Sequence, residues 1–262
     1  WGAGNFVPVP LDTHIHNEPV DLADVVAATV TCDHEIVVSG GDLGFFRAPM
    51  GRGAEQAAAA EAAAPTLVLA LDFLFWYGYG YRGVDGTPHD GTASRLSLLE
   101  RGLKELERFD CPVLVFDFPD MSPAADIILS RSQIPTPEAL AALNARLAEW
   151  ATGRSNVHVL PLAETVDAIR ADEGFTIDDL SWPAGSAVRF ILPDQLHPTT
   201  EGTIALTQMA MRAIDAASDR VESADYLRDP ELVRSRLGSR MVSEARKAGM
   251  AVKTDPKKPA GD

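Results

Sequence analysis

Asp194 and His197 stand three positions apart in the stretch DQLHPTTEG, and Pro193 and Pro198 bracket the pair. Both residues are therefore expected in a loop, immediately before a helix over 200–217. A carboxylate that accepts a hydrogen bond from one imidazole nitrogen fixes the tautomer of the ring. It also stabilises the imidazolium that forms when the other nitrogen takes a proton. The pair suits the orienting acid and general base of a catalytic relay, although an aspartate that caps the turn and a surface histidine would share this spacing.

The elements that must position this loop alternate along the chain between apolar runs and amphipathic stretches. Strands are predicted within 35–41, 66–80, 111–119 and 156–162, and helices over 54–64, 93–109, 136–151 and 200–217. The later strands are too apolar to be half exposed, which is typical of a parallel sheet that is covered on both faces. The pattern therefore predicts a layered α/β fold, in which ligands bind at the carboxyl ends of the strands.

Length and charge limit the domain organisation and the partners. The 262 residues carry a formal net charge of −15 and a pI of about 4.7, which argues against binding to nucleic acids or anionic membrane surfaces. No apolar run is long enough for a membrane helix. Cys32 and Cys111 match no metal or disulfide pattern and are expected as small apolar residues of the core or of a strand edge. We expect one α/β domain over 1–221, a peripheral helical segment over 222–250 and a disordered tail over 251–262.

The motif Asp-x-x-His-Pro, followed by a glycine and a terminal helix, resembles the last motif of the SGNH/GDSL hydrolases. This resemblance implies a three-layer α/β/α sandwich of the flavodoxin-like type and the activity of a serine esterase, lipase or acyl hydrolase. It assigns the general base to His197 and the orienting acid to Asp194. It further implies a small-molecule, lipid or sugar ester as substrate and no metal or organic cofactor.

The nucleophile of that family lies in a Gly-Asp-Ser-x-x-x-Gly motif after the first strand, and the printed chain contains no Gly-Asp-Ser. Its first residues, WGAGN, resemble the continuation of the motif. The resemblance therefore places the serine, and the first strand of the sheet, just upstream of Trp1. Ser39 is the alternative nucleophile, because it precedes two glycines at the end of a predicted strand.

The oxyanion donors are expected after the next two strands. Gly41 is the best match to the family's oxyanion glycine and Gly40 the second, since a glycine lets the backbone approach the substrate closely. The family's Gly-x-Asn-Asp motif has no counterpart, because Phe75 stands near the asparagine position. Asp72 is nearby, and it could help an oxyanion only if burial kept it protonated. Asp72, Phe75 and Trp76 are candidates for a pocket lining, although the aromatic stretch 73–81 also suits a core.

Two other functions remain open. Asp12, His14 and His16 form an Asp-x-His-x-His pattern like that of metal-dependent amidohydrolases. The prolines around the pattern favour a solvated loop over a strand. The missing asparagine also fits a catalytically inactive SGNH-like binding protein.

Overall fold

The computed structural model of the protein describes residues 6–11, 15–34, 39–41, 44–89, 91–177, 179–217 and 225–250. Its centre is a parallel sheet of three strands, in the order β3 (Val68–Leu69), β4 (Val113–Phe116) and β5 (Val157–Leu160). Pairing continues beyond β3, because the Phe116 N–H donates to the Leu71 carbonyl at 3.3 Å. The carboxyl ends of all three strands therefore meet at one edge of the sheet.

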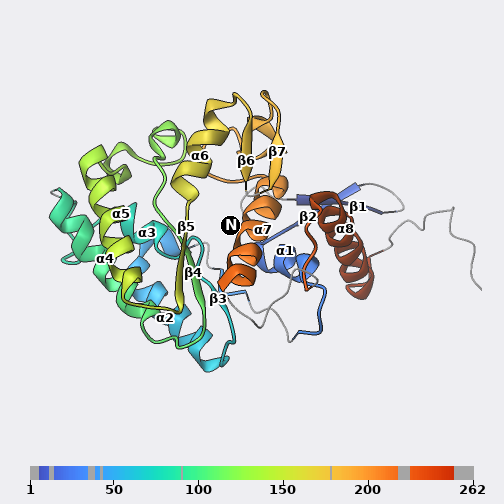
Figure 1. Ribbon diagram of the computed structural model, residues 1–262, viewed down its shortest axis with the longest axis horizontal. Helices are drawn as coiled ribbons and strands as arrows, with labels where there is room; N and C mark the ends of the chain where they lie inside the picture. Colours follow the sequence, from blue (N-terminus) through green and yellow to red (C-terminus); the bar gives the residue numbers. More distant parts are fainter. Residues whose placement is uncertain are drawn as a thin grey trace, which may run out of the picture.

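Side chains of β4 alternate between two cores. Val113 and Val115 face one core, and Leu114 and Phe116 face the other. The first core contains residues of α2 (Pro49–Ala62), α3 (Phe75–Gly78), α4 (Thr92–Leu106) and α5 (Pro137–Thr152). The second contains residues of α6 (Leu162–Ala171) and α7 (Thr200–Ala217), so helices cover both faces of the sheet (Figure 1). The predicted α/β class with a parallel sheet is confirmed.

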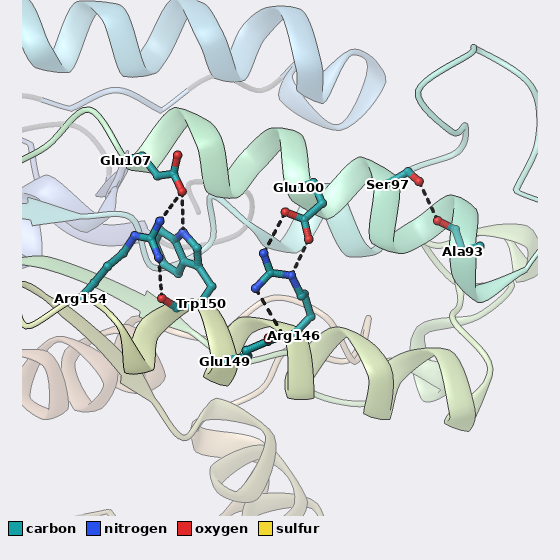
Figure 2. Close-up of polar contacts among 8 residues, drawn as sticks. All are labelled: Ala93, Ser97, Glu100, Glu107, Arg146, Glu149, Trp150 and Arg154. Carbon is teal, nitrogen blue, oxygen red and sulfur yellow. Dashed lines mark hydrogen bonds and ion pairs between the residues drawn. The ribbon is translucent and has the colours of Figure 1, made fainter.

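Helices α4 and α5 are also joined by charged side chains along their exposed faces (Figure 2). Arg146 donates to Glu100 through two nitrogens, one of the two hydrogen bonds being 3.0 Å long. Glu107 accepts from the indole of Trp150 at 3.2 Å and from the guanidinium of Arg154. Such exposed pairs contribute little free energy each, so the buried leucines between these helices carry most of the packing.

Tyr77 anchors the aromatic stretch that leads from β3 into α3. Its ring is fully buried against Gly102 of α4, where a Cβ would lie 2.7 Å from Tyr77 Cδ2. Its hydroxyl donates to the Pro49 carbonyl at 2.9 Å, at the start of α2. Since Phe75 and Trp76 directly precede Tyr77, this anchor fixes their position at the carboxyl edge of the sheet.

A third core lies beyond α7. It joins an antiparallel hairpin of β1 (Phe6–Pro10) and β2 (Ile15–Pro19) to α1 (Leu22–Thr29), α7 and α8 (Pro230–Lys247). Figure 1 shows α8 and the hairpin side by side at one end of the molecule. The described part of the predicted helical segment, residues 225–250, thus contains one helix, α8. The side chains of Val233, Leu237 and Met241 are buried and pack α8 against this core. The tail over 251–262 lies outside the described residues.

The remaining elements are short. A second hairpin, β6 (Phe175–Ile177) with β7 (Leu180–Trp182), lies between α6 and α7. Turns of 3₁₀ type, η1 to η4, occupy Phe45–Arg47, Ser122–Ala124, Arg131–Gln133 and Ala187–Arg189. None of the helices in the described part of the chain is both long and apolar enough to cross a membrane.

Three local expectations were wrong. The strand expected over 66–80 ends early and turns into α3, because aromatic side chains can fill a core from a helical turn as well as from a strand. The segment around His16 forms a hairpin, not a loop, and both of its strands are edges on which proline is tolerated. Cys32 is exposed and lies in no strand, whereas Cys111 is half-buried and packs against the first core just before β4, as expected. The strand expected within 35–41 falls largely on residues 35–38, which lie outside the described residues.

Candidate functional site

Asp194 and His197 are in direct contact. Asp194 Oδ2 and His197 Nδ1 are 2.8 Å apart, so the ring donates to the carboxylate in the tautomer that carries its proton on Nδ1. Asp194 Oδ1 accepts from the backbone N–H groups of Leu196 and His197, both at 3.0 Å. The carboxylate therefore holds the loop and the ring at once, which leaves Nε2 of His197 as the nitrogen that can accept a proton.

These hydrogen bonds set the charge state of Asp194. Burial alone would raise the pKa of its carboxyl, but the N–H groups of His197 and Leu196 and the imidazole outweigh burial and lower the pKa. Asp194 is thus held as a carboxylate at neutral pH, as the orienting acid of a relay requires.

The loop that carries the pair is a closed turn. Leu192 donates its N–H to the His197 carbonyl at 2.8 Å, and Gln195, at its tip, has a left-handed φ of 63°. Thr199 N–H donates to the Phe190 carbonyl at 2.9 Å before α7 begins. Gly202, in the first turn of α7, packs so closely on Phe190 that a Cβ would lie 2.3 Å from the Phe190 carbonyl oxygen. The glycine after the Asp-His motif therefore allows the helix to reach the loop.

His197 forms part of the wall of a cavity of about 120 Å³ at the carboxyl edge of the sheet. Asp72, Phe75 and Trp76, which were expected as pocket residues, line the same cavity. The rest of the wall is mostly apolar and comes from the ends of β3 and β4, from α6, the second hairpin, the loop before α7 and α7 itself: Leu71, Phe116, Asp117, Phe118, Met121, Leu162, Val166, Ile169, Ile177, Phe190, Ile191, Gln195, Leu196, Pro198, Gly202 and Leu206. The cavity therefore combines one imidazole with a surface that suits a hydrocarbon group.

Two of the residues that line this cavity carry carboxyl groups and come directly after strands of the sheet. Asp72 comes directly after the segment paired with β4, and Asp117 directly after β4. Burial raises the pKa of both groups. Asp117 accepts the Ala163 N–H at 2.7 Å, in the first turn of α6, and thereby caps that helix. Asp117 thus has a structural role at the start of α6.

Arg170, which the sequence did not single out, connects the wall to the His197 loop. Its Nη2 donates to the Gln195 carbonyl at 2.8 Å and lies 3.2 Å from Met121 Sδ, and its Nη1 donates to the Asp120 carbonyl. Burial lowers the pKa of this guanidinium. No signal in the sequence marks Arg170, because it lies on α6 and meets its partners only through the tertiary fold.

Ser39, Gly40 and Gly41 are exposed, and none of them lines the cavity. Ser39 Oγ donates to Asp21 Oδ2 at 2.8 Å and accepts the Gly41 N–H at 3.4 Å. No serine is among the described residues of the cavity wall. The alternative nucleophile Ser39 and the expected oxyanion glycines Gly40 and Gly41 are thus not brought to His197 by the described part of the chain.

Only part of the Asp-x-His-x-His pattern, the candidate metal site, lies among the described residues. Asp12 and His14 lie outside the described residues, and His16 Nε2 is 3.0 Å from Glu18 Oε2. Within the described ranges, no group of three or more His, Cys, Asp or Glu side chains could hold a metal ion. A Ser-His contact, His89 Nδ1 to Ser94 Oγ at 2.9 Å, lies at the start of α4, and neither residue lines the cavity.

The chain was compared with protein-family models, with curated proteins and with solved structures, and none of them matches it. The chemistry of the cavity therefore has to be argued from its own residues.

Proposed function

We propose that the protein is a serine hydrolase of the SGNH/GDSL type that cleaves carboxylic esters through an acyl-enzyme. One observation carries the proposal: the hydrogen-bonded Asp194–His197 pair, with its 2.8 Å contact, lies in the wall of an apolar cavity at the carboxyl edge of a parallel sheet. Helices on both faces of that sheet support the three-layer, flavodoxin-like arrangement that the family would have.

The nucleophile in this proposal is the serine that the resemblance places immediately before Trp1. Its oxygen bonds to the carbonyl carbon of the ester while His197 Nε2 takes the hydroxyl proton, and the carbonyl electrons move onto the oxygen. The tetrahedral intermediate then collapses, the bond to the alkoxy oxygen breaks, and His197 returns the proton to the departing alcohol. Water repeats the sequence on the acyl-enzyme and releases the acid. Asp194 stabilises the imidazolium in both halves.

The wall of the cavity favours an ester with an apolar acyl or aryl group. Phe75, Trp76 and Phe116 provide flat hydrocarbon surface beside His197, and the reaction uses no metal or organic cofactor. A small-molecule, lipid or sugar ester would each satisfy this requirement, since only the group next to the carbonyl enters the cavity.

The test is hydrolysis of p-nitrophenyl esters by the full-length protein, combined with labelling by a fluorophosphonate and mapping of the labelled peptide. We expect turnover, a single labelled serine just before Trp1, and the loss of both in His197→Ala. His34→Ala is the matched control, because His34 is exposed and does not line the cavity, and its ring lies 2.9 Å from the Cys32 carbonyl. Turnover that survives His197→Ala would refute the proposal, and a folded protein without turnover or label would point to an inactive binding protein.

A further inference from the structure

An aromatic patch adjoins the cavity wall at Trp76. The centre of the Phe46 ring lies 5.7 Å from that of Trp76 and 6.4 Å from that of Tyr81, and the ring planes are tilted by 48° and 49°. Trp76 lines the cavity, Phe46 is half-buried and Tyr81 is 41% exposed. These three residues form the aromatic patch, a continuous ring surface that runs from the cavity wall to solvent.

The core and the backbone hold the patch in place. Phe45 is buried in the first core, whereas Phe46, the next residue of η1, lies outside that core. Gly80 turns the chain after α3 so closely that a Cβ would lie 2.9 Å from the Trp76 carbonyl oxygen. This turn brings Tyr81 back toward Phe46, so the rings are positioned before any ligand arrives.

The patch can contact a part of the substrate that the cavity does not hold. An ester diverges from its carbonyl carbon into an acyl part and an alcohol part, and the carbonyl has to lie beside His197 for the proposed reaction. The cavity, at about 120 Å³, accommodates one of these parts, which the proposed function assigns to the acyl group. The alcohol part then lies outside the cavity, where Trp76 connects the wall to Phe46.

The chemistry of the patch favours an aromatic ring as its occupant. Tilted rings present both faces and edges, and aromatic rings prefer to contact one another in offset-stacked or edge-to-face arrangements. The polar atoms of the patch are the indole N–H of Trp76 and the hydroxyl of Tyr81, and the Arg47 guanidinium lies 5.3 Å from the centre of the Phe46 ring. A sugar ring carries more hydroxyl groups than these few atoms can bind, whereas a phenyl ring needs no hydrogen-bond partner.

We propose that the aromatic patch binds an aromatic ring in the alcohol part of the ester, and that the protein therefore prefers esters of aryl-substituted alcohols. This inference rests on the proposed hydrolase function and names the substrate class of that site. The ring contacts are equally present in the bound substrate and in the transition state, so they should lower KM more than they raise kcat. Tyr81 is the most exposed member of the patch and determines specificity by direct contact with the ring.

The experiment compares kcat and KM for phenethyl, cyclohexylethyl and butyl acetates in the full-length protein. The acyl group is the same and the alcohols are similar in acidity, so the comparison isolates the ring. The parent should prefer phenethyl over cyclohexylethyl acetate by roughly tenfold in kcat/KM, and Tyr81→Leu should reduce this ratio about threefold, mainly through KM. Tyr81→Phe keeps the ring and should keep the ratio. Phe6→Ala is the matched control, because Phe6 is 48% exposed on β1 and does not line the cavity.

Several outcomes would overturn the inference. A ratio near one in the parent, or a ratio that Tyr81→Leu leaves unchanged in a protein with an unaltered thermal melt, would show that the patch does not select the ring. Faster hydrolysis of an acetylated glucose than of phenethyl acetate would assign the patch to a sugar. A sharp rise in rate once the ester exceeds its solubility would assign it to a lipid surface.

The proposed hydrolase function is tested separately. Loss of turnover in His197→Ala together with an unchanged ratio in Tyr81→Leu would refute the role of the patch alone, whereas turnover that survives His197→Ala would refute the hydrolase proposal. If the parent hydrolyses none of these esters, saturation-transfer NMR of phenethyl alcohol still tests the patch. Binding that weakens in Tyr81→Leu and not in Phe6→Ala would support ring binding, and equal signals in all three proteins would refute it.

Discussion

Arg170 donates a hydrogen bond of 2.8 Å to the carbonyl oxygen of Gln195, in the loop that carries Asp194 and His197. The same guanidinium donates to the Asp120 carbonyl, so one side chain of α6 joins the loop after β4 to the loop before α7. Gln195 has a left-handed φ of 63°, which is an unfavourable conformation for a residue other than glycine. The Arg170 contact therefore helps to hold Gln195, between Asp194 and Leu196, in this unfavourable backbone conformation.

Arg170→Ala should lower kcat by about 10²-fold with little change in KM, because a displacement of about 1 Å in His197 is enough for such a loss. Arg170→Lys should recover part of the rate, since an ammonium can still donate to one of the two carbonyls. Ester hydrolysis over a range of substrate concentrations tests this. Arg131→Ala is the control, because Arg131 is 82% exposed and pairs with Asp126 on the surface. Equal losses in both variants, or no loss in Arg170→Ala, would contradict a positioning role.

Two helical glycines should respond to alanine in opposite ways. A Cβ at Gly202 would lie 2.3 Å from the Phe190 carbonyl oxygen, and backbone cannot yield as a flexible side chain can. Gly202→Ala should therefore lower the free energy of unfolding by about 1–3 kcal/mol or more and disturb the His197 loop. Gly238 of α8 has open space at the Cβ position, so Gly238→Ala should raise stability by about 0.4–1 kcal/mol. Urea unfolding of both variants checks the pair, and a stable Gly202→Ala would show that α7 can shift away from Phe190.

The sequence predicted the elements whose ends carry strong local signals. The helix over 200–217 was expected with the bounds that α7 has, because Pro198 and a periodic apolar face define it. The helix expected over 136–151 begins where Thr136 caps α5, and Thr136 Oγ1 accepts the Ala139 N–H at 3.3 Å. The Asp194–His197 contact could be anticipated for the same reason, since three residues of chain and two prolines determine it.

One local signal, the capping box between Asp21 and Asp24, is visible in the sequence, yet the helix α1 that it starts was not predicted. Features that depend on distant contacts could not be predicted in this way. The turn of the aromatic stretch into α3 depends on the space that Gly102 leaves for Tyr77, and that space exists only in the folded protein. The role of Arg170 likewise arises from burial and from partners 25 and 50 residues away.

The lowered pKa of Asp194 predicts a loss of stability in acid. The group ionises more easily in the folded state than at its ordinary pKa of 3.8, so its stabilising contribution is present above about pH 4. It is lost as pH falls through the lower pKa of the folded state. Asp194→Asn should be less stable than the parent at neutral pH, and the difference should shrink below about pH 4, where the parent carboxyl is protonated.

Denaturant unfolding of parent and Asp194→Asn between pH 7 and pH 2 measures this difference. Asp33→Asn serves as the control, because Asp33 is exposed and does not line the cavity. A difference for Asp194→Asn that stays constant over the whole range would mean that its hydrogen bonds do not favour the carboxylate.

The apolar cavity predicts how the rate depends on the acyl chain. Each methylene that leaves water contributes about 0.8 kcal/mol, so kcat/KM for linear esters should rise about fourfold per carbon until the cavity is filled. Val166 of α6 is buried and lines the cavity, and Val166→Phe should remove this rise while leaving acetyl ester hydrolysis nearly unchanged. Leu232→Phe, at a position that is 54% exposed on α8, should have no effect.

If Val166→Phe proves unstable in a thermal melt, Trp76→Ala provides the second test, because a larger cavity should move the optimum to longer chains. A rate that is independent of chain length in the parent would mean that the acyl group does not enter this cavity, and the alcohol side of the ester would then have to occupy it.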